Sequence, residues 1–524
     1  MNQRMPLDAL PLPGPARLAD CADAPAVFFA DVDANAWRRI AGAVAAGAGR
    51  LVAIWGAQDD AGALAVSAAY ALDDGLLWAR LPLGDAVGYP DLSALFPPAV
   101  RMQRAVRDLC GLQADGATDV RPWLNHGNWP ADYFALRKPA TGTERFASHE
   151  ADYAFTRVAG DGVHEVAVGP IHAGIIEPGH FRFSVVGEKV LRLEARLGYA
   201  HRGVERLFER TPALAGHRVA ARIAGDSSVA FAYAYCVALE RALGTTVPPR
   251  AQWLRALLLE RERVANHLGD LGALGNDAGF AFGLAQFSRI KEDWLRENER
   301  AFGHRYLFDA IAPGGIARDL DRDCADAMRA QCDRVGRDVR SLRRIYDDHA
   351  GLQDRFAKTG VLAPSMAARL GVCGLAARAS GVAMDLRTDY RPTPYREIGA
   401  RRSGEAHGEA RGDVAARVAL RFDEIDESLR QIRAILADAP QGDVAVQPGI
   451  GRAPSRGVGW VEGWRGDVLV ALETRADGTL ARCHCHDPSW RNWPALEVAI
   501  IGNIVADFPL INKSFNLCYA GHDL

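Results

Sequence analysis

Long amphipathic segments in the second half of the chain constrain the fold more than any other feature. Between Ala251 and Leu274, apolar side chains recur at helical spacing and form one stripe, made of Leu254, Leu257, Leu258, Val264, Leu268 and Leu271. We expect further long helices over His217 to Leu243, Arg289 to Phe302, Asp321 to Tyr346 and Asp413 to Leu436. Because an apolar stripe must be buried against a neighbour, these segments predict a helical bundle.

The first part of the chain predicts a small α/β module. We expect helices at Ala34 to Ala48 and Met102 to Gly111, and strands at Leu51 to Trp55, Leu64 to Tyr70 and Leu76 to Leu81. The stretch that follows, from Asp115 to Glu150, is polar and contains proline and glycine, which is typical of a linker or extended arm.

A β-hairpin is predicted before the helical bundle begins. Phe181, Phe183 and Val185 alternate with more polar residues, and the alternation resumes at Leu191 after the Gly187-Glu188-Lys189 turn. Short strands are expected again after Pro448. We therefore predict an α+β protein, with an α/β module at 1–114, a linker at 115–150, and a mainly helical bundle domain at 151–524 that has a hairpin or small sheet near its start and short strands near its C-terminus.

Composition excludes several classes of function. The formal net charge is -3 over 524 residues, so nothing indicates binding to nucleic acid. The nine cysteines do not form a disulfide framework, which favours a reducing compartment. No secretory signal is visible, and the most apolar stretch, Ala495 to Ile511, contains Glu497, Asn503 and Asp507, so we expect no membrane span. The glycine-rich fingerprints that bind NAD or ATP are absent.

Several motifs follow one another along the second part of the chain. In order they are Gly169-Pro-Ile-His-Ala-Gly174, His201-Arg-Gly-Val-Glu205, Arg222-Ile-Ala-Gly225, Pro313-Gly-Gly315, Arg378-Ala-Ser-Gly381 with Asp385 and Arg387, Val461-Glu-Gly-Trp-Arg-Gly466 and Ser514-Phe-Asn-Leu-Cys-Tyr-Ala-Gly521. Through these motifs, residues 150–524 resemble one family of large subunits, which includes those of the energy-converting (group 4) nickel-iron hydrogenases and the quinone-site subunit of complex I. Within this family the resemblance is greater to the formate-hydrogenlyase type. The N-terminal module resembles the small partner subunit of complex I, through Tyr133-Phe-Ala-Leu-Arg-Lys138.

The resemblance also shows which metal ligands are missing. In the hydrogenases an Arg-x-Cys-Gly-x-Cys-x-x-x-His motif follows Arg-Gly-x-Glu by sixteen residues, and here Ala224, Ser227 and Phe231 stand at the Cys, Cys and His positions. The second cysteine pair falls on Cys518 and Gly521. A nickel-iron centre needs four soft thiolate ligands, and one thiol remains. The resemblance therefore implies a variant without the metal, and we expect no metal ligands in this chain.

Two charged residues of that site persist, and their role stays open. By resemblance, Glu205 corresponds to the glutamate that passes protons to and from the metal thiolates, and Arg465 to the arginine above the iron. Together with Arg222 they are candidates for handling protons and charge. Alternatively, Glu205 forms a structural ion pair with Arg222 or Arg465.

The complex I resemblance offers a second use for the same region, a quinone pocket. There a loop histidine and a tyrosine of the following helix bind the quinone headgroup. His180, or else His172, matches the histidine, whereas the tyrosine position aligns with Ala224-Gly225. A loop histidine can equally be a solvated or capping residue.

Two other histidine-containing features are interpreted structurally. Cys483-His484-Cys485-His486 looks like a metal motif, but successive residues of a strand point to opposite faces and no second pair lies near, so we predict a strand. His267, one helical turn after Arg263, is expected to be a hydrogen-bonded structural histidine.

The resemblance implies a subunit of a membrane-associated oxidoreductase complex, one that couples electron transfer in a neighbouring iron-sulfur subunit to proton or ion translocation. A cavity lined by His180, Glu205, Arg222 and Arg465 would provide the coupling. Partners would be a small iron-sulfur subunit that carries the cluster, and antiporter-like and anchor subunits that hold this chain at the cytoplasmic face of the inner membrane. Two alternatives stay open, an NADH-quinone oxidoreductase-type subunit with a quinone site and a scaffold with an inert cavity. Hydrogenase activity of this chain alone is not expected.

Overall fold

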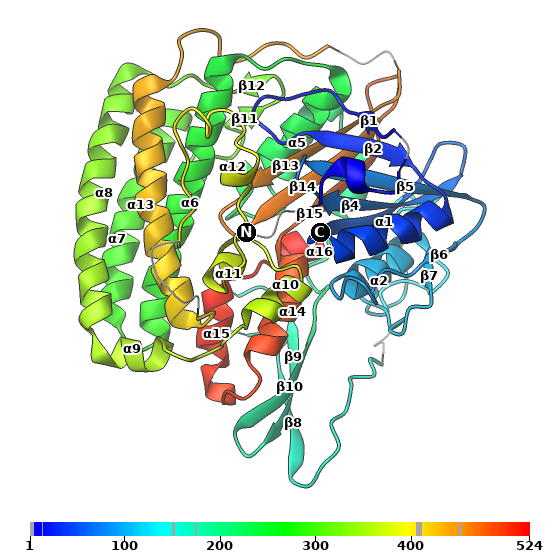
Figure 1. The fold of residues 1–524 in the computed structure, drawn as a ribbon, viewed down its shortest axis with the longest axis horizontal. Helices are drawn as coiled ribbons and strands as arrows, with labels where there is room; N and C mark the ends of the chain where they lie inside the picture. The colour runs from blue at the N-terminus through cyan, green and yellow to red at the C-terminus, as the bar shows by residue number, and fades with distance from the viewer. Residues whose placement is uncertain (1–4, 13, 149–151, 173–175, 405–410, 450–452) are drawn as a thin grey trace.

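The computed structural model describes residues 5–12, 14–148, 152–172, 176–404, 411–449 and 453–524. Ala173 and Gly174 of the Gly-Pro-Ile-His-Ala-Gly motif, and the last residues of the predicted linker, lie outside the described residues. The arrangement is α+β, as predicted, with the helical bundle on one side and the N-terminal sheet on the other (Figure 1).

The N-terminal module is built on a sheet with strand order β1-β2-β5-β4-β3. Its strands are β1 (Ala16–Arg17), β2 (Val27–Asp31), β3 (Arg50–Gln58), β4 (Leu64–Ala71) and β5 (Leu76–Gly84), and its helices are η1 (Leu7–Ala9), α1 (Ala34–Ala46) and α2 (Ala99–Cys110). A short parallel pair, β6 (Gly88–Pro90) and β7 (Gln113–Asp115), lies beside it. β2 pairs with β5 in parallel and the other ladders of this sheet are antiparallel, so the predicted helices and strands are confirmed.

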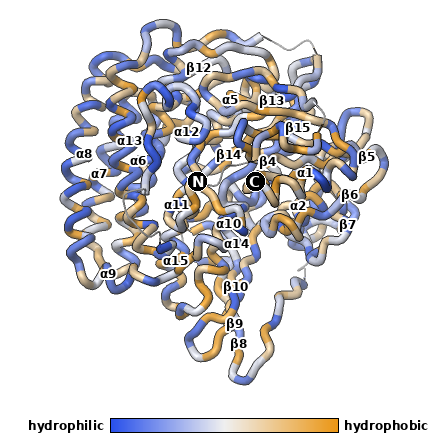
Figure 2. The backbone as a smooth tube through the Cα atoms, in the orientation of Figure 1, coloured by the Kyte–Doolittle hydropathy of each residue, from blue (hydrophilic) through white to orange (hydrophobic). Residues whose placement is uncertain are grey.

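The long helices pack side by side, as the apolar stripes predicted (Figure 1). They are α6 (Pro249–Asp277), α7 (Ala281–Phe302), α8 (Arg322–Asp348) and α13 (Val414–Asp438). Figure 2 shows that α8 consists largely of hydrophilic residues, in keeping with its position at the edge of the bundle, while the sheets contain more hydrophobic residues. Shorter segments connect the bundle to the rest: β11 (Ile311–Ala312), β12 (Gly315–Ile316), α9 (Ala350–Phe356), α10 (Pro364–Arg369), α11 (Gly374–Ala379) and α12 (Leu386–Asp389).

One predicted helix is interrupted. The segment expected as a single helix over His217 to Leu243 forms α4 (Gly216–Ala220) and α5 (Ser228–Leu243), with a turn over 222–227 between them. The turn persists because the first amide groups of α5, those of Val229 and Ala230, donate to the Glu262 carboxylate at 2.6 and 3.2 Å. The prediction of one continuous helix was therefore wrong, since the capping group comes from α6, far away in the sequence.

A C-terminal antiparallel sheet links the two halves of the molecule. It contains β13 (Ser455–Glu462), β14 (Asp467–Thr474) and β15 (Leu480–His486), so the Cys-His-Cys-His segment is a strand, as predicted. One face packs on the N-terminal sheet through a cluster that includes Trp55, Trp78 and Trp460. The chain ends in α14 (Ser489–Ala499), η3 (Val505–Asp507), α15 (Phe508–Phe515) and α16 (Ala520–Asp523). No helix of the described residues combines the length and the hydropathy that a membrane crossing would need.

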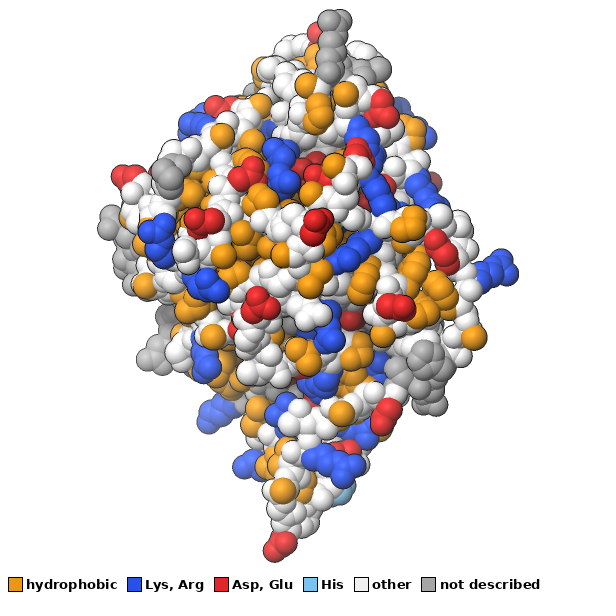
Figure 3. Space-filling view, turned by 90° about the vertical axis from the view of Figure 1, so that its right-hand side faces the viewer, with side chains coloured by type: hydrophobic (Ala, Val, Ile, Leu, Met, Phe, Trp, Pro, Cys, Tyr) orange, Lys and Arg blue, Asp and Glu red, His pale blue; other side chains and the backbone are white. Residues whose placement is uncertain are grey.

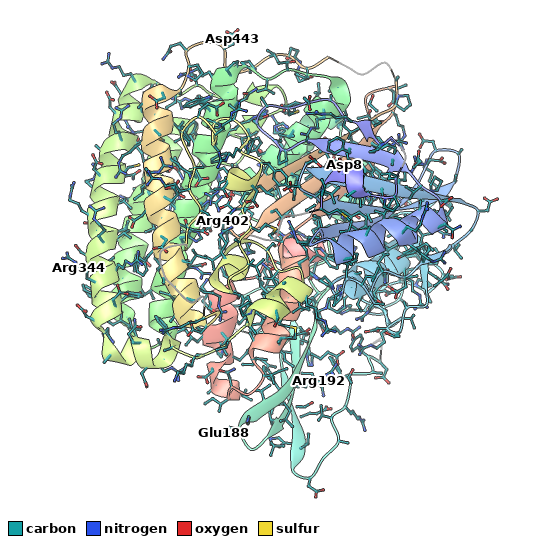
Figure 4. All side chains as sticks on the ribbon, viewed as in Figure 1. Asp8, Glu188, Arg192, Arg344, Arg402 and Asp443 are labelled. Atoms are coloured by element: carbon teal, nitrogen blue, oxygen red, sulfur yellow. The ribbon has the colours of Figure 1, made fainter. Side chains whose placement is uncertain are left out.

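A three-stranded sheet projects from the body (Figure 1, bottom). The predicted hairpin is β9 (His180–Val186) and β10 (Lys189–Arg196), and β8 (Val163–Val168), which the sequence did not reveal, pairs with β9. Phe181 and Phe183 lie fully buried against Phe508, at ring centroid distances of 4.8 and 5.0 Å. The remaining short helices, α3 (Val204–Glu209) and η2 (Ala213–Ala215), follow β10. Glu188 and Arg192 of this sheet lie at the periphery in Figure 4.

The surface of the N-terminal side carries charges of both signs. Figure 3 shows lysine, arginine, aspartate and glutamate side chains interspersed on this face, without a continuous basic patch. This distribution agrees with the small net charge of the sequence.

Helix α5 lies so close to β13 that two glycines of the strand are required. A Cβ added at Gly459 would lie 1.8 Å from the carbonyl oxygen of Ala234, and one at Gly457 would lie 1.8 Å from that of Ala238. We expect Gly459→Ala to lower the free energy of unfolding by about 3 kcal/mol, because the added methyl group forces helix and strand apart. Gly42→Ala, in α1 with nothing within 4 Å of its Cβ, is the control and should be neutral or stabilising by up to about 1 kcal/mol in urea denaturation. Equal stability of Gly459→Ala and the unaltered protein would contradict the close approach.

Candidate functional site

Two segments far apart in the sequence meet in the interior. The turn between α4 and α5 carries Ala224 and Ser227, each 3% exposed, and the C-terminal segment carries Cys518 and Gly521. These are the four positions at which the resemblance places the metal thiolates. The Cys518 backbone amide donates to Ser489 Oγ at 2.9 Å, and the Gly521 amide donates to Cys518 Sγ at 3.0 Å.

Arg465 joins the two segments. Its guanidinium donates to Asp226 Oδ2 at 2.6 Å and to Ser227 Oγ at 3.3 Å on one side, and to the carbonyl oxygen of Asn516 at 2.5 Å on the other. The side chain is 4% exposed. Burial lowers the pKa of Arg465, but the neighbouring Asp226 carboxylate outweighs this effect and keeps it above its usual value. Arg465 is therefore a fixed positive charge where the two segments meet.

The Asp487 carboxyl occupies the space beside Gly521. A Cβ added at Gly521 would lie 2.4 Å from Asp487 Oδ2 and 3.1 Å from Cys518 Sγ. Asp487 is fully buried, its Oδ1 accepts from the Ser489 amide at 2.7 Å, and its Oδ2 has no hydrogen-bond partner among the described residues. Burial raises the pKa of the Asp487 carboxyl, and burial also raises that of the Cys518 thiol well above its usual value. A side chain at position 521 would require Asp487 to move.

Glu205 lies in a different place from Arg465. It is the second residue of α3 and accepts from Arg482 at 3.0 Å and from His484 Nδ1 at 2.6 Å. Burial raises the pKa of Glu205, but the charges of Arg482 and His484 outweigh it and the pKa falls to about 2. The partners considered from the sequence, Arg222 and Arg465, are not those of Glu205 in the structure.

Arg222 is a surface residue. Its side chain is 52% exposed and forms a two-pronged pair with Asp309 at 2.7 and 2.9 Å. The four residues expected to line one cavity, His180, Glu205, Arg222 and Arg465, share no contact among the described residues, because Arg222 faces solvent and the other three have separate sets of partners.

The two loop histidines are both held by backbone carbonyl groups. His172 Nε2 lies 2.7 Å from the Gly179 carbonyl oxygen, and His180 Nδ1 lies 3.2 Å from that of Gly169. His180 Nε2 accepts from Arg182 Nε at 3.3 Å, and burial lowers its pKa. Both ring nitrogens of His180 are thus engaged within the protein.

Sequence reasoning missed several residues of the site. Asp226 and Asp487 lie next to motif positions but had no motif of their own, and Arg482 and His484 are 277 and 279 positions from Glu205. The sequence did hold a signal for His484 and His486, because residues two apart on a strand share a face and these two histidines were therefore expected on the same side. Among the described residues, no group of three or more His, Cys, Asp or Glu side chains is arranged to hold a metal ion.

A network of buried charges lies between α6, α12, α13 and β13. Four carboxyl groups, those of Glu260, Asp385, Glu424 and Glu462, are paired with the three guanidinium groups of Arg263, Arg378 and Arg387. His267 Nε2 lies 2.7 Å from Glu424, as expected of a structural histidine. Burial, reinforced by the neighbouring Asp385 carboxylate and only partly offset by Arg378, raises the pKa of Glu462 to about 7.

Two family models and many known proteins match the chain. Residues 30–145 match the model of the 30 kDa subunit of respiratory-chain NADH dehydrogenase, and residues 277–457 match that of its 49 kDa subunit. Formate hydrogenlyase subunit 5 of Escherichia coli is 34% identical over 444 residues, which cover 83% of this chain and 77% of that protein. A carbon monoxide-induced hydrogenase of Rhodospirillum rubrum is 32% identical over 356 residues, covering 68% of this chain and 98% of that protein. An NADH-quinone oxidoreductase subunit of Acidiphilium cryptum is 30% identical over 284 residues, or 54% of this chain and 69% of that protein.

A solved structure is also similar. A chain of the membrane-bound sulfane sulfur reductase, an archaeal respiratory membrane complex, superposes with a TM-score of 0.65 at 26% sequence identity, covering 69% of this chain and 99% of that chain. The predicted resemblance to hydrogenase and complex I subunits, with the small module fused in front, is confirmed by these matches.

The raised pKa of Glu462 predicts that the free energy of unfolding depends on pH. Because the folded-state pKa of Glu462 lies above its ordinary value of 4.5, its contribution to stability is complete below about pH 4.5 and is lost as pH rises through about 7. The glutamine side chain of Glu462→Gln is neutral at every pH. The free energy of unfolding of this variant, relative to that of the unaltered protein, should therefore rise by about 1 kcal/mol per pH unit between about pH 4.5 and 7.

Urea denaturation between pH 4.5 and 7.5 measures this difference. Glu424→Gln is the matched control from the same network. The Arg378 and His267 contacts outweigh the effect of burial on Glu424 and hold its pKa well below the usual range, so its removal should destabilise the protein most at neutral pH. Parallel pH profiles for the two variants would contradict the assignment of the proton to Glu462.

Proposed function

Because the chain belongs to the family that includes formate hydrogenlyase subunit 5 and the 49 kDa subunit of respiratory-chain NADH dehydrogenase, we propose that it is a subunit of a membrane-associated oxidoreductase complex. In this proposal the chain has no nickel-iron centre, and it couples electron transfer in a neighbouring iron-sulfur subunit to proton or ion translocation. It is held peripherally at the membrane by antiporter-like and anchor subunits. Support for the assembly comes from a relative named as a subunit of formate hydrogenlyase, and from two others whose names describe a membrane-bound hydrogenase subunit and a respiratory membrane complex.

The observation that carries the loss of the metal is the chemistry of the four ligand positions. Ala224 and Gly521 have no donor atom, and the Ser227 hydroxyl is a hard, weakly acidic ligand that binds Arg465. Cys518 accepts a hydrogen bond from Gly521 and has a raised pKa, which disfavours the thiolate. These residues do not fit a nickel-iron centre, and the Asp487 carboxyl lies where the fourth ligand would extend.

The charged residues that remain, Arg465 and Glu205, are suited to a role in handling charge or protons. Arg465 connects the turn before α5 with the C-terminal segment, so a change of charge at this point would be felt by both. Glu205 is held ionised by Arg482 and His484, so the His484 imidazole beside this carboxylate is the group that can hold a proton. Arg222 has no part in this role at its exposed position. We propose that the two buried clusters respond to the redox state of the partner subunit.

The alternative function, a quinone site, has one supporting observation. The ring of Tyr519 packs on Gly179, next to His180, such that a Cβ added at Gly179 would lie 2.6 Å from Tyr519 Cε1. A histidine and a tyrosine are thus close together in a loop region, the pair of residue types that the complex I resemblance assigns to quinone binding. Against it, both ring nitrogens of His180 already have partners.

Metal analysis of the purified complex tests the leading proposal. We expect nickel far below one equivalent per copy of this chain, because one thiol cannot replace four. An active nickel-iron hydrogenase purified under the same conditions serves as the positive control for metal retention. Stoichiometric nickel in this subunit would contradict the proposal.

The quinone alternative is tested by His180→Ala in the intact complex. We expect quinone-dependent electron transfer, where the complex has any, to stay within about twofold, because His180 is held by backbone and Arg182. His164→Ala, on the exposed part of β8, controls for general effects on this sheet. A loss of tenfold or more in His180→Ala alone would favour the quinone site over the leading proposal.

A further inference from the structure

A small cavity lies where the N-terminal module meets the rest of the chain. Its volume is about 40 Å³. Most of its lining is apolar and includes Met102 and Ala105 of α2 and Trp55 of β3. The polar part of the lining comes from Glu205, from His484 and His486 of β15, and from Asp523 near the C-terminus.

Three residues that line this cavity each have a buried polar side-chain atom with no hydrogen-bond partner among the described residues. These atoms are His484 Nε2, His486 Nε2 and Trp490 Nε1. Their side chains are 7%, 1% and 5% exposed, so bulk water does not satisfy them. An unsatisfied buried donor or acceptor costs on the order of 1–3 kcal/mol, and three in one cavity would be a large penalty for a folded protein.

Other contacts fix the orientation of these groups. The His484 ring stacks on Trp55 at 4.9 Å with an angle of 11°, and the His486 ring stacks on Trp490 at 6.1 Å with an angle of 20°. Because His484 Nδ1 faces the Glu205 carboxylate at 2.6 Å, that nitrogen carries the proton and donates, which leaves Nε2 as an acceptor. The indole Nε1 of Trp490 can only donate. The residues of the cavity therefore offer one acceptor, His484 Nε2, and one donor, Trp490 Nε1, while His486 Nε2 can take either role.

We propose that this cavity is a binding site for an ordered water cluster that connects Glu205, through His484, with His486 and Trp490. A water needs about 10–15 Å³ of such volume and two to four polar partners, so the cavity has room for roughly three waters. The waters satisfy the three unpartnered atoms, and the N-terminal module covers the site.

The cluster gives Glu205 a connection that its direct contacts do not. A proton that reaches His484 Nε2 from a water makes the imidazole cationic beside the ionised Glu205 carboxylate, so that the pair can hold this proton until Nε2 returns it to the water. This part of the inference rests on the proposed function, because it gives Glu205 a role with protons. The water site itself rests only on the geometry of the cavity.

A structure of the complex at a resolution that shows ordered waters tests the site directly. The expected result is at least two waters, within hydrogen-bond distance of His484 Nε2, His486 Nε2 or Trp490 Nε1. A dry cavity, or one filled by side chains, would overturn the inference. Waters at this site combined with unchanged proton coupling in Glu205→Gln would leave the water site standing and remove the proposed function of Glu205.

Filling the cavity distinguishes a wet site from a packing defect. Ala105→Leu extends from α2 into the cavity. If waters are present, it displaces them and strands the imidazole nitrogens, and the unfolding equilibrium constant should rise about tenfold. If the cavity is dry, the same substitution fills an apolar void and lowers that constant, which would overturn the inference.

A second variant controls for overpacking. His486→Phe keeps a ring stacked on Trp490 but removes the nitrogen that needs a water. In the His486→Phe background, the tenfold effect of Ala105→Leu should shrink to about threefold or less, because fewer polar atoms are stranded. An equal effect in both backgrounds would mean that steric clash, and not lost water, causes the change, and would overturn the inference.

Discussion

Buried arginine-carboxylate pairs are the interaction on which this fold depends. Arg263, Arg378 and Arg387 lie at or below 6% exposure among four carboxyl groups, between α6, α12, α13 and β13. Taking such charges out of water costs several kcal/mol per ion, and removing one partner costs about 3–5 kcal/mol, because an uncompensated charge is left behind. The helices and the sheet can therefore pack in one relative position, in which every guanidinium has its carboxylate. The two glycines of β13 allow α5 to close onto the sheet in that position.

The same constraint explains the arrangement at Arg465. A guanidinium buried to 4% exposure needs a negative or polar partner on each side, and the sequence has no thiol at three of the four ligand positions. Asp226 provides the charge, while Ser227 and the carbonyl oxygen of Asn516 provide the remaining acceptors. Arg465 can therefore be buried because Asp226 and Ser227 of the turn before α5 and Asn516 of the C-terminal segment compensate its charge and accept its hydrogen bonds. Charge compensation by these residues joins the turn before α5 to the C-terminal segment.

Local patterns predicted most of the fold, and long-range contacts account for what they missed. The stripe of Leu254 and Leu268 was sufficient for α6, and the alternation after Phe181 was sufficient for the hairpin. The break before α5 was missed because Glu262, from another helix, caps Val229 and Ala230. In the site, motif spacing located Glu205 and Arg465, but their partners Arg482, His484 and Asp226 could not be inferred, since tertiary packing alone brings them close.

The position of Asp487 bears on whether the lost ligands could simply be restored. At Gly521 even a methyl group would approach the Asp487 carboxyl to 2.4 Å, so a cysteine there demands that a buried carboxyl move. That carboxyl is held by the Ser489 amide, and Ser489 Oγ in turn accepts from the amide of Cys518. A change at position 521 would therefore spread to Cys518, the one remaining thiol. Because Arg465 is at the same time bound to Asp226, the residues of this region form a self-consistent packing of their own, and each further substitution would have to disturb several hydrogen bonds at once.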